Sequence, residues 1–224
     1  VASRGLGDVY KRQLLFSVDA ANAKSYSGSG TAWNDLGTKA YNLTLVNSPT
    51  YSAGTFAFNG SSQRADGADY AFLNFNTGNF TISFWMKPTA WADGSSRGII
   101  DKKSGDGANG WTIYNDGTQP TKINARLGLQ NNFFSTNAVT TNVWQNWVFM
   151  RSGSSIYWYL NGALDNTGTS SYLLNDTAIL GVGYSKTWGG YFQGSLSNIA
   201  IYDRALTNAE ISQNFNAARG RYGI

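Results

Sequence analysis

The sequence predicts an all-β domain with many turns, arranged as a sandwich or barrel, and one short helix near its C-terminal end. Glycine contributes 26 and asparagine 23 of the 224 residues, and aromatic residues make up 15%. Charged residues reach 13%, about half the roughly 25% of an average domain. Short apolar runs alternate with turn clusters at intervals of about eight to twelve residues, a spacing typical of β-sandwiches and barrels.

The expected strands follow this alternation along the whole chain. The predicted ranges are 14–19, 41–46, 55–59, 79–87, 97–103, 110–115, 122–129, 133–139, 144–151, 155–161, 163–167, 178–184 and 193–202. The range 79–87 carries the clearest signal, because Phe80, Ile82 and Phe84 alternate with Thr81 and Ser83. Pro88 follows that range and predicts its end, since proline cannot donate to a strand ladder.

Two local motifs predict a hairpin and a helix. Asn161-Gly162 predicts a two-residue type I′ turn, because both central residues of that turn need positive φ. Thr207 and Glu210 have the spacing of a capping box at a helix start, with Leu206 and Ile211 at the positions of a hydrophobic staple. The helix is expected to run to about residue 219, with Gly220 as its stop.

The first thirteen residues have a different character. Residues 3–13 read SRGLGDVYKRQ, and the part DVYKRQ resembles the translated end of a transposon adaptor used in sequencing libraries. We therefore expect residues 1–13 to be a non-native tail and residues 14–224 to form one domain, with a natural start and any signal peptide lost. Without this tail, 14 basic and 12 acidic residues remain, so the formal charge falls from +4 to +2.

The composition excludes several kinds of chemistry. The chain has no cysteine and no histidine, and Glu210 is its only glutamate. Disulfides, thiolate nucleophiles, Cys/His zinc sites and serine–histidine triads are therefore impossible. No apolar run of about 18 residues that could span a membrane is present.

Several segments, in order, resemble the laminin G-like branch of the concanavalin A-like lectin/glucanase superfamily. They are 25–31 (SYSGSGT), 33–36 (WNDL), 55–60 (TFAFNG), 79–88 (NFTISFWMKP), 144–148 (WQNWV), 157–162 (YWYLNG), 190–196 (GYFQGSL) and 199–207 (IAIYDRALT), after Asp19. The resemblance implies a two-sheet antiparallel jelly-roll sandwich with one short C-terminal helix. The SYSGSG loop also resembles domains of virion and tail proteins of bacterial viruses.

The enzyme hypothesis depends on acid pairs. Retaining glucanases of this fold carry two glutamates about 5 Å apart on one strand, which a chain with a single glutamate cannot provide. Aspartates at Asp66/Asp69 and Asp101/Asp106 have candidate spacing, but they stand among glycine and serine, where aspartate mainly forms turns. We therefore expect no enzyme, and an aspartate-based glycoside hydrolase is the remote alternative.

Calcium binding stays open, because calcium needs only oxygen ligands. By resemblance, Asp203 after the last strand is a candidate structural ligand. Asp101 and Asp106 are candidates for a site at the sheet rim, although Lys102 and Lys103 between them oppose a cation. No cofactor other than calcium is suggested.

Sugar binding is the more specific hypothesis for the remaining aromatic residues. Aromatic rings can stack on the apolar C–H face of a sugar while polar side chains bind its hydroxyls. The candidates are Trp188, Tyr191, Trp111 and Tyr114, with Asn115, Asp116 and Arg126 as polar partners. Tryptophans on strands (Trp85, Trp144, Trp147, Trp158) are expected mainly in the core.

The leading interpretation is a non-catalytic recognition domain that binds a glycan or another surface ligand, as a module of an extracellular, cell-surface or virion protein. A structural decoration or assembly domain of a phage virion, without a small ligand, is the alternative. The scattered lysines and arginines and the low net charge do not indicate nucleic-acid binding, and no membrane insertion is expected. The sequence leaves the oligomeric state open.

Overall fold

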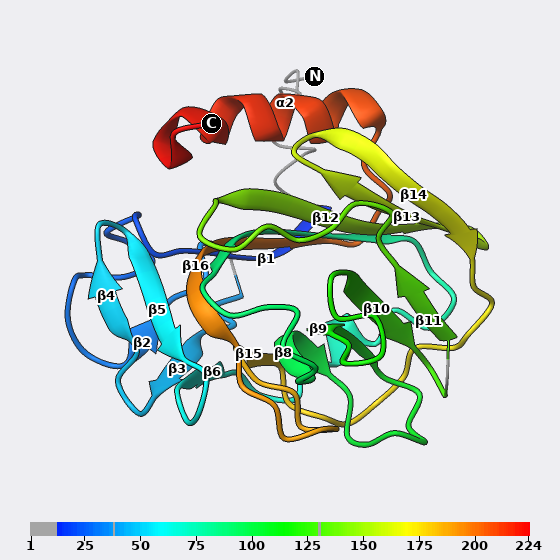
Figure 1. Cartoon of the computed structure of the whole chain (residues 1–224), viewed down its shortest axis with the longest axis horizontal. Coiled ribbons are helices and arrows are strands. Elements are labelled where there is room, and N and C mark those ends of the chain that lie inside the picture. Colours follow the sequence, from blue (N-terminus) through cyan, green and yellow to red (C-terminus); the bar gives the residue numbers. More distant parts are fainter. Residues whose placement is uncertain (1–12, 38, 130) are drawn as a thin grey trace, which may run out of the picture.

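A computed structural model describes residues 13–37, 39–129 and 131–224, which form two packed antiparallel sheets with a helix on top (Figure 1). The first sheet, sheet A, has the strand order β14-β13-β12-β7-β16-β5-β4, with β1 also paired to β16. Its strands are β1 (Leu14–Asp19), β4 (Thr50–Ser52), β5 (Thr55–Asn59), β7 (Phe80–Pro88), β12 (Gln145–Ser152), β13 (Ser155–Leu160), β14 (Ala163–Thr169) and β16 (Gln193–Tyr202).

The second sheet, sheet B, has the order β11-β10-β9-β8-β15-β6-β3-β2. Its strands are β2 (Ala32–Trp33), β3 (Leu43–Val46), β6 (Arg64–Asp66), β8 (Arg97–Lys102), β9 (Trp111–Asn115), β10 (Ile123–Leu127), β11 (Asn131–Phe134) and β15 (Gly181–Val182). Both sheets join strands that are distant in the sequence, as in β15 between β6 and β8. The two-sheet antiparallel jelly-roll sandwich with one C-terminal α-helix is thus confirmed.

The core lies between the inner faces of the two sheets. Alternation along each strand sends one set of side chains inward; on β9, for example, Trp111 and Ile113 face the core. Trp147 and Trp158 also belong to this core, with ring centroids 5.9 Å apart at nearly a right angle. These two strand tryptophans are therefore core residues, as expected.

The outer face of sheet A is covered by α2 (Asn208–Ala218) and the following 3-10 turn η2 (Arg219–Tyr222). The Thr207–Glu210 capping box is present, and Leu206 and Ile211 are buried in a small apolar cluster beneath the helix. Trp85 stacks between sheet and helix, 3.9 Å from the Tyr222 ring and 5.7 Å from the Phe215 ring. Gly220 is not the helix stop; the left-handed residue that ends this segment is Gly223, because the chain first tightens into η2.

Most predicted strands match, and most of the differences lie in sheet B. The ranges predicted as 133–139 and 178–184 contain the shorter strands β11 and β15. The short strands β2, β4 and β6 and the 3-10 turn η1 (Ala71–Leu73) were not predicted. Asn161 and Gly162 both have positive φ, 51° and 79°, as the hairpin prediction requires. The predicted non-native tail lies, except for Gln13, outside the described residues.

Candidate functional site

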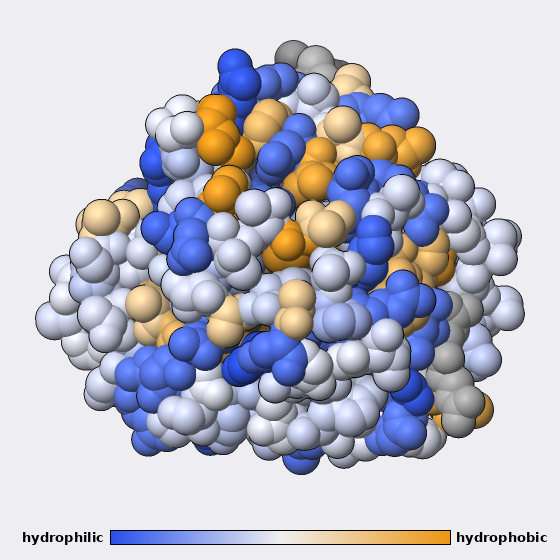
Figure 2. All heavy atoms as spheres, viewed as in Figure 1, coloured by the Kyte–Doolittle hydropathy of each residue, from blue (hydrophilic) through white to orange (hydrophobic). Residues whose placement is uncertain are grey.

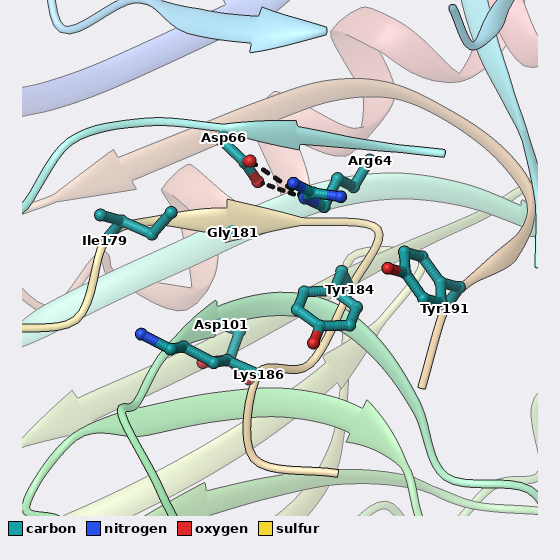
Figure 3. Close-up of a pocket in the computed structure, with 8 residues that line it drawn as sticks. All are labelled: Arg64, Asp66, Asp101, Ile179, Gly181, Tyr184, Lys186 and Tyr191. Carbon is teal, nitrogen blue, oxygen red and sulfur yellow. Dashed lines mark hydrogen bonds and ion pairs between the residues drawn. The ribbon is translucent and has the colours of Figure 1, made fainter. Parts of the chain in front are cut away.

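A pocket of about 320 Å³ opens on the outer face of sheet B (Figure 3). It lies over three neighbouring strands, β6, β15 and β8, and beside the loop that follows β15. Its lining residues are Arg64, Asp66, Asp101, Ile179, Gly181, Tyr184, Lys186 and Tyr191. The pocket therefore combines aromatic rings, an aliphatic side chain and four charged groups.

Gly181 forms the floor of the pocket between two aspartates. It stands opposite Asp66 on one side and Asp101 on the other, so all three positions share one face of the sheet. The Cα atoms of these aspartates are two strand spacings apart, about 10 Å. A Cβ at Gly181 would lie 3.6 Å from the Tyr184 carbonyl oxygen and 3.8 Å from Asp101 Cβ, ordinary contact distances. The absence of a side chain thus leaves a slot between the two carboxylates.

Arg64 stands at the edge of this slot. Its Nε donates to both carboxylate oxygens of Asp66, at 2.9 and 3.0 Å, and its Cζ lies 5.7 Å from the centroid of the Tyr184 ring. These contacts hold the guanidinium in place through an ion pair and a cation–π contact. Lys186, on the opposite side of the slot, is exposed.

Asp101 is buried, with 2% of its surface exposed. Its Oδ1 accepts from the Lys103 backbone N–H at 2.8 Å, and its Oδ2 accepts from the Thr112 hydroxyl at 3.2 Å. Burial raises the pKa of this carboxyl to about 6, because desolvation outweighs the hydrogen bonds, from Lys103 and Thr112 among others, that stabilise the charged form.

The loop 184–191 forms the aromatic wall of the pocket. The rings of Tyr184 and Tyr191 lie 4.5 Å apart, tilted by 38°. The loop closes on itself, since Ser185 N–H donates to the Gly190 carbonyl at 2.9 Å, and Gly98 N–H donates to the same carbonyl at 3.1 Å. A Cβ at Gly98 would lie 2.1 Å from the Ser185 nitrogen, so only glycine allows the loop to pack this closely on β8.

The structure brings together four of the predicted sugar-binding residues outside the pocket. Trp188 stacks on Tyr114, with centroids 4.3 Å apart, and Arg126 lies 5.3 Å from the Trp188 ring centroid. The Tyr114 hydroxyl donates to Asp116 at 2.7 Å, and Asp116 also accepts from the Thr118 backbone and hydroxyl. Burial is the main reason that the pKa of Tyr114 is raised. This cluster covers sheet B beside the pocket.

Two of the predicted residues lie elsewhere. Trp111 is a core residue, and its Nε1 donates to the Leu73 carbonyl at 3.0 Å. Asn115 is fully buried, and its amide donates to the Pro120 carbonyl at 2.9 Å. Tyr191, in contrast, lines the pocket. Of the seven predicted residues, one therefore lines the pocket, four lie in the neighbouring cluster and two lie in the interior.

The residues predicted for two calcium sites, Asp101 and Asp106 at the sheet rim and Asp203 after the last strand, have different surroundings. Asp101 lines the pocket, Asp106 pairs with Arg126 at 2.5 Å, and Asp203 is exposed after β16. Among residues 13–37, 39–129 and 131–224, no group of three or more acidic side chains could hold a metal ion.

Two buried lysine ammonium groups bind the oxygen atoms near the Asp101–Asp106 segment. Lys102 Nζ contacts Asp69 at 2.8 Å and the Asp176 carbonyl at 2.6 Å, and Lys103 Nζ donates to the carbonyls of Ala108 and Gly128. These contacts are the geometric reason why Lys102 and Lys103 oppose a metal cation at this segment.

The acid pairs of the hydrolase hypothesis are also rearranged. Asp69 is paired with Lys102 and Asp106 with Arg126, whereas Asp66 and Asp101 share one pocket. The sequence did not predict this grouping, and it did not identify Arg64, Gly181, Tyr184 and Lys186 as site residues. Because β6, β15 and β8 are distant in the chain, no local motif could have indicated their pairing.

Comparisons with known proteins agree with the fold described above. A family model described as the concanavalin A-like lectin/glucanases superfamily matches residues 59–212. No curated protein matches the chain. Similar solved structures include the receptor-binding domain of a botulinum neurotoxin C/D mosaic serotype, with a TM-score of 0.69 at 13% identity over 92% of this chain and 52% of that one.

Two further structures show the same fold. The binding domain of Paraclostridial Mosquitocidal Protein 1 has a TM-score of 0.66 at 17% identity, covering 92% of this chain and 52% of that one. A Trypanosoma rangeli sialidase has a TM-score of 0.69 at 15% identity, covering 94% and 33%. The chain thus spans about half of each binding domain and a third of the sialidase chain.

Proposed function

Since this chain belongs to the concanavalin A-like lectin/glucanases superfamily, in its laminin G-like branch, we propose that it is a non-catalytic recognition domain that binds one sugar residue of a glycan in the pocket on sheet B. The pocket carries this proposal. Tyr184 and Tyr191 offer rings to the apolar face of a sugar, and Asp66, Asp101 and Arg64 surround the slot with hydrogen-bonding groups.

The size and composition of the pocket support a small ligand. A volume of about 320 Å³ is at the lower end of small-molecule sites, which combine apolar walls with a few placed polar groups. One sugar ring fits such a volume, with its edge over Gly181 and its hydroxyls toward the two carboxylates. Trp188 and Arg126, beside the pocket, extend the surface for neighbouring residues of the glycan.

Similar structures support a recognition role. One of them, with 15% identity and a TM-score of 0.68, is described as a botulinum neurotoxin type C whose cell entry depends on interaction with two ganglioside molecules. The family and these binding domains favour an extracellular, cell-surface or virion module. Within the part of the chain that the structure describes, no helix is long and apolar enough to cross a membrane.

The direct test of this proposal is a substitution that fills the slot at Gly181 with a larger side chain. We expect Gly181→Val to fold, because a Cβ there makes only ordinary contacts and valine suits a strand. Its methyl groups would occupy the pocket floor and weaken glycan binding by about tenfold or more. Gly220→Val is the matched control, since a Cβ at Gly220 has open space, on η2 beside the other sheet.

A glycan array followed by calorimetry on the best ligand measures both variants. The proposal fails if the wild-type chain binds no glycan, or if Gly181→Val binds as tightly as the wild type while its circular dichroism is unchanged. Loss of binding in the Gly220→Val control would also count against the pocket, because it would indicate a general effect of valine.

One observation favours a second candidate, a glycoside hydrolase. Asp66 and Asp101 line the same pocket in unlike surroundings, one paired with Arg64 and the other buried, and inverting enzymes use carboxyl groups roughly 6.5–9.5 Å apart. Product release from a polysaccharide panel, abolished by Asp66→Asn, would establish this activity. Absence of product with intact binding would support the recognition domain.

A further inference from the structure

We propose that the pocket selects a sugar residue that carries a carboxylate, bound by the free edge of Arg64 and by Lys186; this inference rests on the proposed glycan-binding function. Some charged groups in the pocket already have hydrogen-bond partners within the protein, and others do not. A ligand is recognised by the donors and acceptors that the folded protein leaves unmatched.

The two carboxylates of the pocket have donors within the protein. Asp66 accepts from Arg64 Nε with both oxygens. Asp101 accepts from the Lys103 backbone and the Thr112 hydroxyl. Neither carboxylate therefore needs a ligand cation, and their remaining lone pairs suffice for sugar hydroxyls.

The two cations of the pocket keep most of their donors free. Arg64 uses only Nε toward Asp66; its terminal nitrogens form no hydrogen bond with a described residue, and 27% of its side chain is exposed. Lys186 is exposed, and its side-chain ammonium forms no hydrogen bond or ion pair within residues 13–37, 39–129 and 131–224. The pocket thus offers an excess of N–H donors, and the acceptor that matches them best is an anion.

The guanidinium is also held ready for a carboxylate. Asp66 fixes one edge of Arg64, and the Tyr184 ring lies 5.7 Å from its Cζ, so little side-chain freedom is lost on binding. A guanidinium edge presents parallel N–H groups that match the two oxygens of a carboxylate. Lys186, across the slot from Arg64 (Figure 3), adds a mobile positive charge.

The experiment uses the full chain and an array of uronic- and sialic-acid glycans, each printed beside its carboxyl-reduced, neutral counterpart. We expect the wild type to bind at least one acidic glycan about tenfold more tightly than its reduced form. Lys186→Gln should weaken acid binding by about three- to tenfold and leave the reduced form unchanged. Lys24→Gln, which removes an exposed lysine from the turn after β1, is the charge-matched control and should bind as the wild type does.

The outcomes separate this inference from the proposed function. If neither the acidic nor the reduced glycans bind, the proposed function fails. If reduced glycans bind as tightly as their acidic forms, and Lys186→Gln alters neither, the acid selectivity is wrong while glycan binding stands. Arg64→Lys provides a further check: it keeps the charge but loses the planar edge, so binding of the acidic glycans should fall by a larger factor than binding of their reduced forms.

Discussion

The outer faces of the two sheets have opposite chemistry. Outward positions on sheet A carry apolar side chains such as Trp85, Val148 and Met150, and α2 covers them. Outward positions on sheet B carry Arg64, Asp66 and Asp101 in the pocket, with Thr112, Tyr114 and Asn124 beside it, and the loop 184–191 lies over part of this face. In the view of Figure 2, orange, apolar side chains gather toward the helix side, while the lower part is mainly white and blue.

Under the proposed function, this difference separates stability from recognition: one outer face stabilises the fold and the other binds the ligand. An apolar outer face must be covered, and a helix that covers it removes it from ligands. A polar outer face can remain accessible, and the missing side chain at Gly181 leaves a slot in the floor of the pocket there. The two faces should therefore respond differently to mutation and to pH, and each prediction below tests that contrast.

The largest effect is expected from Trp85→Ala on sheet A. Trp85 is 3% exposed and stacks on Tyr222 and Phe215, so its removal leaves a cavity under the helix and costs about 3–5 kcal/mol of unfolding free energy. Urea denaturation measures this loss. Glycan binding to the folded fraction should be unchanged, and a parallel loss of affinity would show that the two faces are not independent. Trp144→Ala, at a half-buried ring 4.9 Å from Tyr222, should cost less.

A smaller effect with the opposite sign is expected from Asp101→Asn on sheet B. The pKa of Asp101 is raised from 3.8 to about 6 by burial, so the folded state favours the protonated form. Its contribution to stability is complete below about pH 3.8 and is lost as the pH rises through 6. At pH 7 the buried charge costs up to about 3 kcal/mol.

Asparagine keeps the acceptor for the Lys103 N–H and can donate to the Thr112 hydroxyl. The variant should therefore be about 1–3 kcal/mol more stable than the wild type at pH 7, and the gap should close toward pH 4. Denaturation curves at both pH values provide the measurement, with the exposed Asp203→Asn as control. A gap that is equal at both pH values would indicate that the carboxyl is not destabilised by burial.

The fold was more predictable from the sequence than the site was. Alternation along 79–87, the Asn161-Gly162 turn and the Thr207–Glu210 box are local signals, and each matched the structure because short-range geometry determines it. The pocket depends instead on β15 lying between β6 and β8. Strands of two or three residues carry almost no periodic signal, so their partners could not be read from the chain.

The predicted aromatic residues illustrate the same limit. Trp188 and Tyr191 lie in a loop, where neither core nor surface placement is dictated by alternation, and both lie at or beside the pocket. Trp111 and Tyr114 are on one strand, three positions apart, and therefore face opposite sides of sheet B. Alternation could have separated these two, but which of the two sides of sheet B faces the core depends on how sheet A packs against it.

The smallest effect, and the sharpest test of the contrast, is expected from Glu210→Gln at the start of α2. The bidentate hydrogen bonds from Arg204, at 2.7 Å each, lower the pKa of Glu210 to about 2, assisted by the Thr207 backbone N–H and against the cost of partial burial. Because this pKa is lowered, the stabilisation is present above about pH 4.5 and is lost as the pH falls toward 2.

Glutamine should cost about 1–2 kcal/mol at pH 7, since the ion pair is partly exposed and screened while the cap loses its charge. The cost should shrink as the pH falls below 4, so measurements at pH 7 and pH 3 are needed. Between pH 4 and 7, the gain in unfolding free energy of Asp101→Asn over the wild type should change strongly, while the loss caused by Glu210→Gln stays nearly constant. Below pH 4 the opposite holds: the loss caused by Glu210→Gln changes with pH, and the gain of Asp101→Asn does not. If the unfolding free energies of the two variants depend on pH in the same way, the helix-covered face and the open face place their carboxylates in the same environment. That outcome would contradict the division of roles inferred from their side chains.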